Sequence, residues 1–178
     1  LIGVEQGIGV AVGVAILDRA RLDARPQLHV LGRVPGTTSF APLSSAEPAE
    51  QVPGVLVALF ATPLWYANAQ HFRMEMEAAL SRSVGAPRAV VLDAVGMSDI
   101  DYTGVKALAA VLDLLDRQKV GFAFARGGSR VRAALARSGL EARIGPGRFY
   151  GTVGEAVEAM AAAVPPARAA APDGPEAG

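Results

Sequence analysis

Short apolar runs alternate with stretches of helical periodicity along this chain of 178 residues. An apolar run bounded by glycine or proline is typical of a strand in a sheet, and an unbroken run favours a strand covered on both faces. The runs predict strands at Gln27–Val34, Val55–Phe60, Ala89–Leu92 and Gly121–Ala125, with shorter ones at Leu64–Tyr66 and near Ile144.

Between these runs, apolar residues recur three or four positions apart, which is the spacing of one helix face. We expect helices from Asn68 to about Ser83, from Asp101 or Thr103 to about Gln118, after a Ser129 cap, and from a Thr152–Glu155 capping box to Ala162. Strands that alternate with helices indicate an α/β domain with a parallel or mixed sheet. The polar stretch Thr37–Gln51 is expected to be a surface loop.

The two ends of the chain differ from this central part. Leu1–Leu17 is apolar apart from Glu5 and Gln6. As a helix it would be about 25 Å long, slightly less than the ~30 Å core of a bilayer. Several arginines follow, and arginines that flank an apolar helix favour the cytoplasmic side. We therefore predict the end of a last transmembrane helix over residues 1–22; the alternative is an amphipathic helix buried against the domain.

The α/β domain itself is predicted over residues 23–164. Residues 165–178 are rich in alanine and proline and contain no residue that would form a core, so we predict a disordered tail there.

Charge and composition exclude several classes of function. The chain carries 17 basic and 17 acidic residues, which leaves no basic excess for nucleic-acid binding. It has no cysteine, so disulfides and thiolate metal sites cannot form. The two histidines, His29 and His71, are far apart in sequence, which argues against a histidine metal centre. Hydrolase and zinc-protease motifs are absent, and we predict no enzyme, no metal and no cofactor.

The loop between the Ala89–Leu92 run and the next helix is the main candidate site. Its candidate residues are Asp93, Ser98, Asp99, Asp101, Thr103 and Gly104. Backbone N–H groups at a helix start attract anions, and a hydroxyl there is a candidate for phosphorylation. The alternatives are a metal or acid–base site on the three aspartates, and plain helix capping with loop solvation.

Three separated strings carry a resemblance to a known family. VLDAVGMSDIDYTGVKAL (Val91–Leu108) resembles the signature of STAS domains, the fold shared by anti-sigma-factor antagonists and the cytosolic tails of SulP-type anion transporters. LHVLGRVPGTTSF (Leu28–Phe40) and PGVLVALFATPLWYANAQHFR (Pro53–Arg73) are similar to the SulP tails in particular, and the apolar N-terminal stretch is similar to the end of their last membrane helix. The resemblance covers roughly Leu1–Ala162.

The resemblance implies a STAS-like mixed sheet with helices mainly on one side. It further implies the cytosolic C-terminal domain of a SulP-type transporter in the plasma membrane, which moves an inorganic anion, with sulfate the commonest substrate of the family. The domain would act in regulation or assembly, in contact with the membrane domain of the same transporter, and the full-length protein is expected to be a homodimer. Trp65 and Tyr66, beside Asn68, are the predicted interface if they are exposed; burial in the core is the alternative.

The same resemblance leaves two other functions open. In the antagonists the matching loop reads Asp-Ser-Ser-Gly, and the serine before the glycine is phosphorylated; Thr103 holds that place here. A soluble signalling switch phosphorylated at Thr103, with a regulatory protein as partner, is therefore the alternative. Weak nucleotide binding at the Asp101–Gly104 helix start is a third interpretation.

Overall fold

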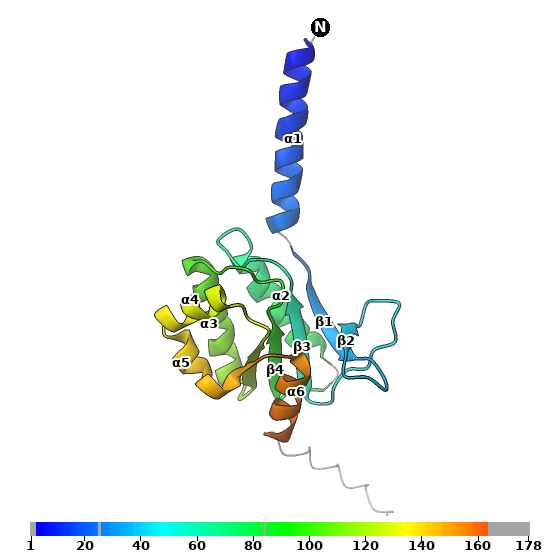
Figure 1. Ribbon diagram of the computed structural model, residues 1–178, viewed down its shortest axis with the longest axis vertical. Coiled ribbons are helices and arrows are strands. Elements are labelled where there is room, and N and C mark those ends of the chain that lie inside the picture. The colour runs from blue at the N-terminus through cyan, green and yellow to red at the C-terminus, as the bar shows by residue number, and fades with distance from the viewer. Residues whose placement is uncertain (1–2, 25, 84, 164–178) are drawn as a thin grey trace, which may run out of the picture.

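The computed structural model describes residues 3–24, 26–83 and 85–163, and it shows an α/β body that follows a long N-terminal helix (Figure 1). The helices are α1 (Val4–Ala24), α2 (Ala69–Arg82), α3 (Tyr102–Arg117), α4 (Ser129–Arg137), α5 (Leu140–Ile144) and α6 (Val153–Ala162), with a 3₁₀ helix at Pro146–Arg148. The strands are β1 (Leu28–Arg33), β2 (Phe40–Pro42), β3 (Val55–Phe60), β4 (Ala89–Asp93), β5 (Gly121–Ala125) and β6 (Phe149–Tyr150).

The strands form one mixed sheet in the order β2-β1-β3-β4-β5-β6. β1 runs antiparallel to both of its neighbours, whereas β3, β4, β5 and β6 are parallel. In the antiparallel pair Leu28 lies opposite Phe60, so β1 begins where β3 ends. The parallel part agrees with the strand–helix alternation of the sequence, because parallel neighbours need a crossover connection.

Side chains alternate along the central strands between two covered faces. On β3, Leu56, Ala58 and Phe60 belong to the larger core, which lies against α2, α3, α4 and α5. Val55 and Val57 belong to the smaller core, which lies against α6. Helices therefore lie mainly on one side of a mixed sheet, which agrees with the fold that the resemblance implies.

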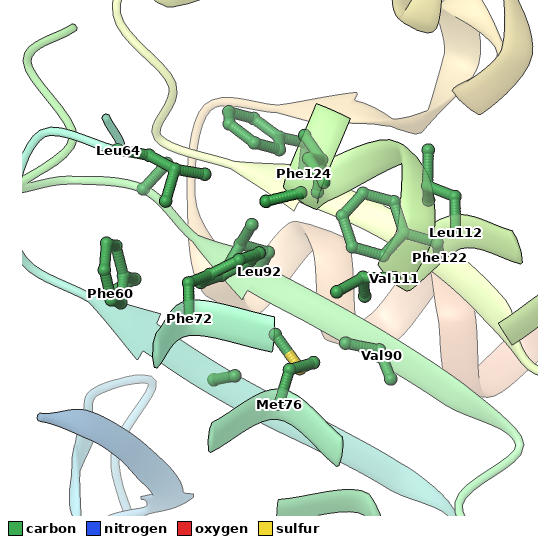
Figure 2. Close-up of a cluster of buried hydrophobic side chains, with 14 of the residues drawn as sticks. Phe60, Leu64, Phe72, Met76, Val90, Leu92, Val111, Leu112, Phe122 and Phe124 are labelled. Carbon is green, nitrogen blue, oxygen red and sulfur yellow. The ribbon is translucent and has the colours of Figure 1, made fainter. Parts of the chain in front are cut away.

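The larger core is built from β3, β4 and β5 on one side and α2 and α3 on the other, as Figure 2 shows. The rings of Phe60 and Phe72 meet edge to face, with 5.0 Å between centroids and 70° between planes. Phe72 and Met76 are one turn apart on α2 and both are fully buried. The helical spacing seen in the sequence thus identified the buried face correctly.

Three of the smaller elements differ from the sequence-based expectation. Leu64–Tyr66 is not a strand, because Leu64 makes only an isolated bridge to Ile100. The segment near Ile144 is the end of α5, and the last strand, β6, comes five residues later. The expected loop Thr37–Gln51 contains β2, which pairs with β1.

The N-terminal helix α1 projects away from the α/β body (Figure 1). Its large apolar side chains are 53–81% exposed, so it is not buried against the domain as the alternative required; they are Val4, Ile8, Val10, Val12, Val14 and Ile16. Within the described ranges, no helix combines the length and the apolar character needed to cross a bilayer. The predicted tail 165–178 lies outside the described residues.

Two helix starts give a matched test of the fold. Thr152 caps α6, because its Oγ1 accepts a hydrogen bond from Glu155 N at 3.2 Å. Ser129 does not cap α4, since the N-cap position belongs to Gly128. We expect Thr152→Ala to lower the free energy of unfolding by about 1 kcal/mol and Ser129→Ala by less than about 0.5 kcal/mol, measured by urea unfolding. Equal losses would contradict this assignment of the caps.

Candidate functional site

The predicted site residues lie at one end of the sheet. β3, β4 and β5 are parallel, so the loops that follow them meet at a common edge, here called the carboxyl edge (residues 61–68, 94–101 and 126–128). Because β1 begins beside the end of β3, α1 enters the domain at this same end (Figure 1). The carboxyl edge and the base of α1 are therefore neighbours in space.

A buried carboxylate anchors the middle of this edge. Asp93, the last residue of β4, has no exposed surface. Its Oδ1 accepts hydrogen bonds from Arg126 Nε at 2.9 Å and from Val95 N at 3.2 Å, and its Oδ2 pairs with Arg126 Nη2. The hydrogen bond to Asp93 raises the pKa of the Arg126 guanidinium, against the opposing effect of burial. A bidentate pair of this kind satisfies a carboxylate that water cannot reach.

The backbone of Arg126 is also unusual. Its φ of 56° lies in the left-handed region, which side chains with a Cβ rarely adopt. Its amide donates to Tyr150 O at 3.0 Å, so the residue ties the end of β5 to β6 as well as to β4. The left-handed turn is what brings the guanidinium back over Asp93.

Asp101 joins the second loop of the edge to the first. Its Oδ1 accepts from Gly104 N at 2.7 Å, which makes it the N-cap of α3, and its Oδ2 accepts from Tyr66 N at 2.9 Å. Its own amide donates to Leu64 O at 3.1 Å. One carboxylate thus caps a helix and holds the neighbouring turn against it.

Two glycines let these loops approach closely. A Cβ on Gly104 would lie 2.3 Å from Leu64 O, and a Cβ on Gly96 would lie 2.5 Å from the backbone of Ala61. Real Cβ contacts are never this short, so both positions require glycine for packing. In the structure, Gly104 therefore has a steric role at the start of α3.

The turn that carries the predicted interface is held from inside by Asn68. The side chain of Asn68 is fully buried; its Oδ1 accepts from Trp65 N at 3.0 Å and its Nδ2 donates to Pro63 O at 2.8 Å. Trp65 is 36% exposed and Tyr66 is 69% exposed, and their rings meet edge to face at 5.1 Å. The turn therefore presents two aromatic rings at the surface, whereas Asn68 positions them and is not accessible.

The remaining predicted residues lie at the surface. Ser98 and Thr103 are exposed, and the carboxylate of Asp99 pairs with Arg130 at 3.7 Å with more than half of both side chains exposed. The three aspartates thus engage different partners. In the described part of the chain, no three His, Asp or Glu side chains come together in a way that could hold a metal ion.

Sequence reasoning missed two features of this end of the domain. It did not assign Arg126, although an aspartate at the end of an apolar run signals a buried acid that needs a cation. It also treated His29 and His71 as unrelated, whereas both line one groove between β1 and α2, together with Glu75 and Arg82.

Comparison with known proteins places this fold and edge in a family. The STAS domain family model matches residues 48–156. The chain is 32% identical over 159 residues to a probable sulfate transporter of Mycobacterium tuberculosis, and the match covers 89% of this chain and 28% of the transporter. The chain therefore belongs to the STAS domain family, and it spans little more than a quarter of the length of the curated relatives that it matches first.

Solved structures show the same fold in two kinds of protein. The murine solute carrier 26 family member A9 anion transporter matches with a TM-score of 0.77 at 22% identity, over 88% of this chain and 25% of its own. An anti-sigma factor antagonist from Mycobacterium paratuberculosis matches with a TM-score of 0.53 at 23% identity, over 63% of this chain and 90% of its own. The fold alone does not separate these functions, but the sequence relatives are sulfate transporters.

The buried ion pair gives a first prediction for the site. Arg126→Ala leaves the Asp93 carboxylate without its cation, and we expect the free energy of unfolding to fall by about 3 kcal/mol. Arg126→Gly removes the same cation but suits the left-handed backbone, so it should be about 1 kcal/mol more stable than Arg126→Ala. Arg130→Ala, which breaks only the exposed pair with Asp99, is the control and should cost less than about 1 kcal/mol. Urea unfolding that ranks Arg126→Ala with this control would refute the anchoring role.

The close approach at Gly104 gives a second prediction. Gly104→Ala places a methyl group against the carbonyl of Leu64, and we expect a loss of about 2 kcal/mol in the free energy of unfolding. Gly147→Ala is the matched control, because a Cβ there meets nothing within 4 Å. Thermal and urea unfolding should separate the two variants; a neutral Gly104→Ala would show that the loop moves aside freely.

Proposed function

We propose that this chain is the STAS domain of a SulP-type sulfate transporter, preceded by the cytosolic end of that protein's last transmembrane helix over residues 1–22. The observation that carries the proposal is α1, whose apolar side chains project from a STAS fold with 53–81% of their surface exposed. Leaving such side chains in water costs about 1.5–3 kcal/mol each, and a bilayer removes that cost. The sulfate transporters among the relatives support the same assignment.

The length of α1 supports a defined distance between the domain and the bilayer. The first charged residue after the apolar stretch is Asp18, and the seven residues from there to Ala24 rise about 10 Å as a helix. The headgroup layer on each side of a bilayer is only about 5–8 Å thick. The α/β body would then begin just beyond the headgroups, on the cytoplasmic side of the plasma membrane, with its carboxyl edge facing back toward the membrane.

In this arrangement the carboxyl edge contacts the cytosolic surface of the membrane domain of the same transporter. Trp65 and Tyr66 are the anchors, since exposed aromatic rings held by a rigid turn lose little conformational entropy on binding. The 94–101 loop lies beside them. The domain acts in regulation or assembly, within a homodimeric transporter, and sulfate passes through the membrane part. We assign no catalytic step to the domain.

Thr103 supports a second candidate. Its hydroxyl is exposed in the first turn of α3, as in a phosphorylated antagonist switch, but Asp101 stands at the N-cap and Asp99 pairs with Arg130 nearby. A phosphate there would face the carboxylate of Asp101. Mass spectrometry of the protein from its native host tests this candidate, and nucleotide binding at the same helix start is tested by titration to millimolar concentration.

The test of the leading proposal uses the full-length gene. We expect apolar spans ahead of residue 1, and sulfate uptake in a host strain that lacks its own transporter. Removing residues 26–178 should reduce uptake, expression or dimer assembly. Trp65→Ala with Tyr66→Ala should reduce uptake several-fold at equal surface amounts, whereas Met74→Ala, an exposed apolar residue on α2, should not. Full uptake, expression and assembly after deletion would overturn the proposed role.

A further inference from the structure

A surface groove lies between α3 and α4, separate from the Trp65–Tyr66 turn. It encloses about 540 Å³ and opens to solvent. Its floor is apolar and is formed by Ile100, Val105, Ala109, Ala134 and Leu140. Ile100, Ala134 and Leu140 are buried, and Val105 and Ala109 lie one turn apart on α3 and are half-buried. The floor is therefore a row of small and aliphatic side chains with room above it.

Two cations stand at the rim of this groove without a carboxylate partner among the described residues. Lys106 Nζ lies 4.9 Å from the ring centroid of Tyr102, and Arg137 lies across on α4; both line the groove. Asp101 also lines it, but both of its oxygens accept backbone hydrogen bonds. Two cations and one carboxylate therefore line the rim, which keeps a net positive charge.

Two arginines on α4 and α5 are paired with carboxylates, in contrast to the two cations at the groove. Arg132 pairs with Glu141 at 2.9 Å, and Arg143 pairs with Asp113 at 2.8 Å and with Asp116 at 2.6 Å. These arginines form ion pairs within the domain, whereas the two cations at the groove do not. Positive charge that faces an apolar floor is complementary to an acidic amphipathic surface.

We propose that this groove binds an acidic amphipathic helical segment of a partner protein. An amphipathic helix places apolar residues three and four positions apart, and such a row matches an apolar trough between two helices. Acidic residues beside that row would meet Lys106 and Arg137, and Tyr102, which is 73% exposed, would close one end. A small molecule fits less well, because small-molecule sites bury 70–90% of their ligand and this groove is open.

Two other grooves among the described residues lack this combination. The groove at the start of α6 contains Arg126, which is committed to Asp93, together with the carboxylates of Glu155 and Glu158. The groove that holds both histidines contains Glu75 and Arg82, which pair at 3.9 Å. The first groove therefore presents carboxylates and the second an ion pair, and neither combines unpaired cations with an apolar floor. The α3–α4 groove does not depend on the proposed transporter function, because it is a property of the folded domain.

The test uses the 178-residue chain in nanodiscs of phosphatidylcholine, which carry no net charge, with empty nanodiscs subtracted. The probe is a labelled 18-residue helical peptide with leucines at positions i, i+3, i+4 and i+7 and glutamates elsewhere; its match in which lysine replaces glutamate is the control. We expect the acidic peptide to bind with a dissociation constant in the micromolar range and the basic one to bind at least about tenfold more weakly.

Variants of the chain test whether the peptide binds in the groove between α3 and α4. Lys106→Glu with Arg137→Glu should weaken binding of the acidic peptide about tenfold and flatten its salt dependence. Lys119→Glu with Arg117→Glu makes the same charge change at the far end of α3 and should leave binding unchanged. Ala109→Leu fills the floor without changing charge and should also weaken binding, which keeps the test valid if the double reversal fails to fold. Equal binding of both peptides, no binding at 1 mM, or insensitivity to both groove variants would overturn the proposal.

Discussion

The buried carboxylate of Asp93 is the constraint on which the carboxyl edge depends. Removing a carboxylate from water costs several kcal/mol, and only a well-placed cation with further hydrogen bonds offsets that cost. Arg126 meets the requirement from the end of the next strand, and it does so through a left-handed backbone that itself costs about 1–2 kcal/mol. Asp93 also accepts a hydrogen bond from Val95 N, and the amide of Arg126 donates to Tyr150 O. The ion pair between Asp93 and Arg126 therefore fixes where the 94–101 and 126–128 loops begin.

Asp101 then determines how the 94–101 loop lies against the 61–68 turn. A carboxylate that served only as an N-cap would leave the 61–68 turn free, but the second oxygen of Asp101 holds Tyr66 N. Gly104 makes this contact sterically permissible, and Asn68 stiffens the turn from below. Polar contacts of Asp101 and Asn68 therefore hold the exposed rings of Trp65 and Tyr66, and those of Asn68 are half-buried.

The sequence predicted an element correctly where a single pattern of apolar residues determines that element. Val55–Phe60 and Gly121–Ala125 are strands with the predicted bounds, since a fully covered strand must be apolar throughout. β2 and the single bridge at Leu64 escaped prediction, because each is specified by a partner on another segment of the chain, and the five-residue helix α5 was also missed. Among site residues, Asp101 or Thr103 was predicted as the start of α3 from local spacing, and Asp101 is the N-cap. Arg126 was not assigned, because its partner lies 33 positions away and no local pattern records the contact.

The position of α1 brings the N-terminal helix close to the carboxyl edge. β1 begins beside the end of β3, and only three residues separate β1 from α1, so the end of α1 and the start of β1 are at most about 14 Å apart. β1 pairs with β3, and the chain runs from the end of β3 directly into the Trp65 turn. The ion pair between Asp93 and Arg126 joins the ends of β4 and β5 at the same edge. The base of α1 is therefore connected to the carboxyl edge through paired strands and not through a long loop.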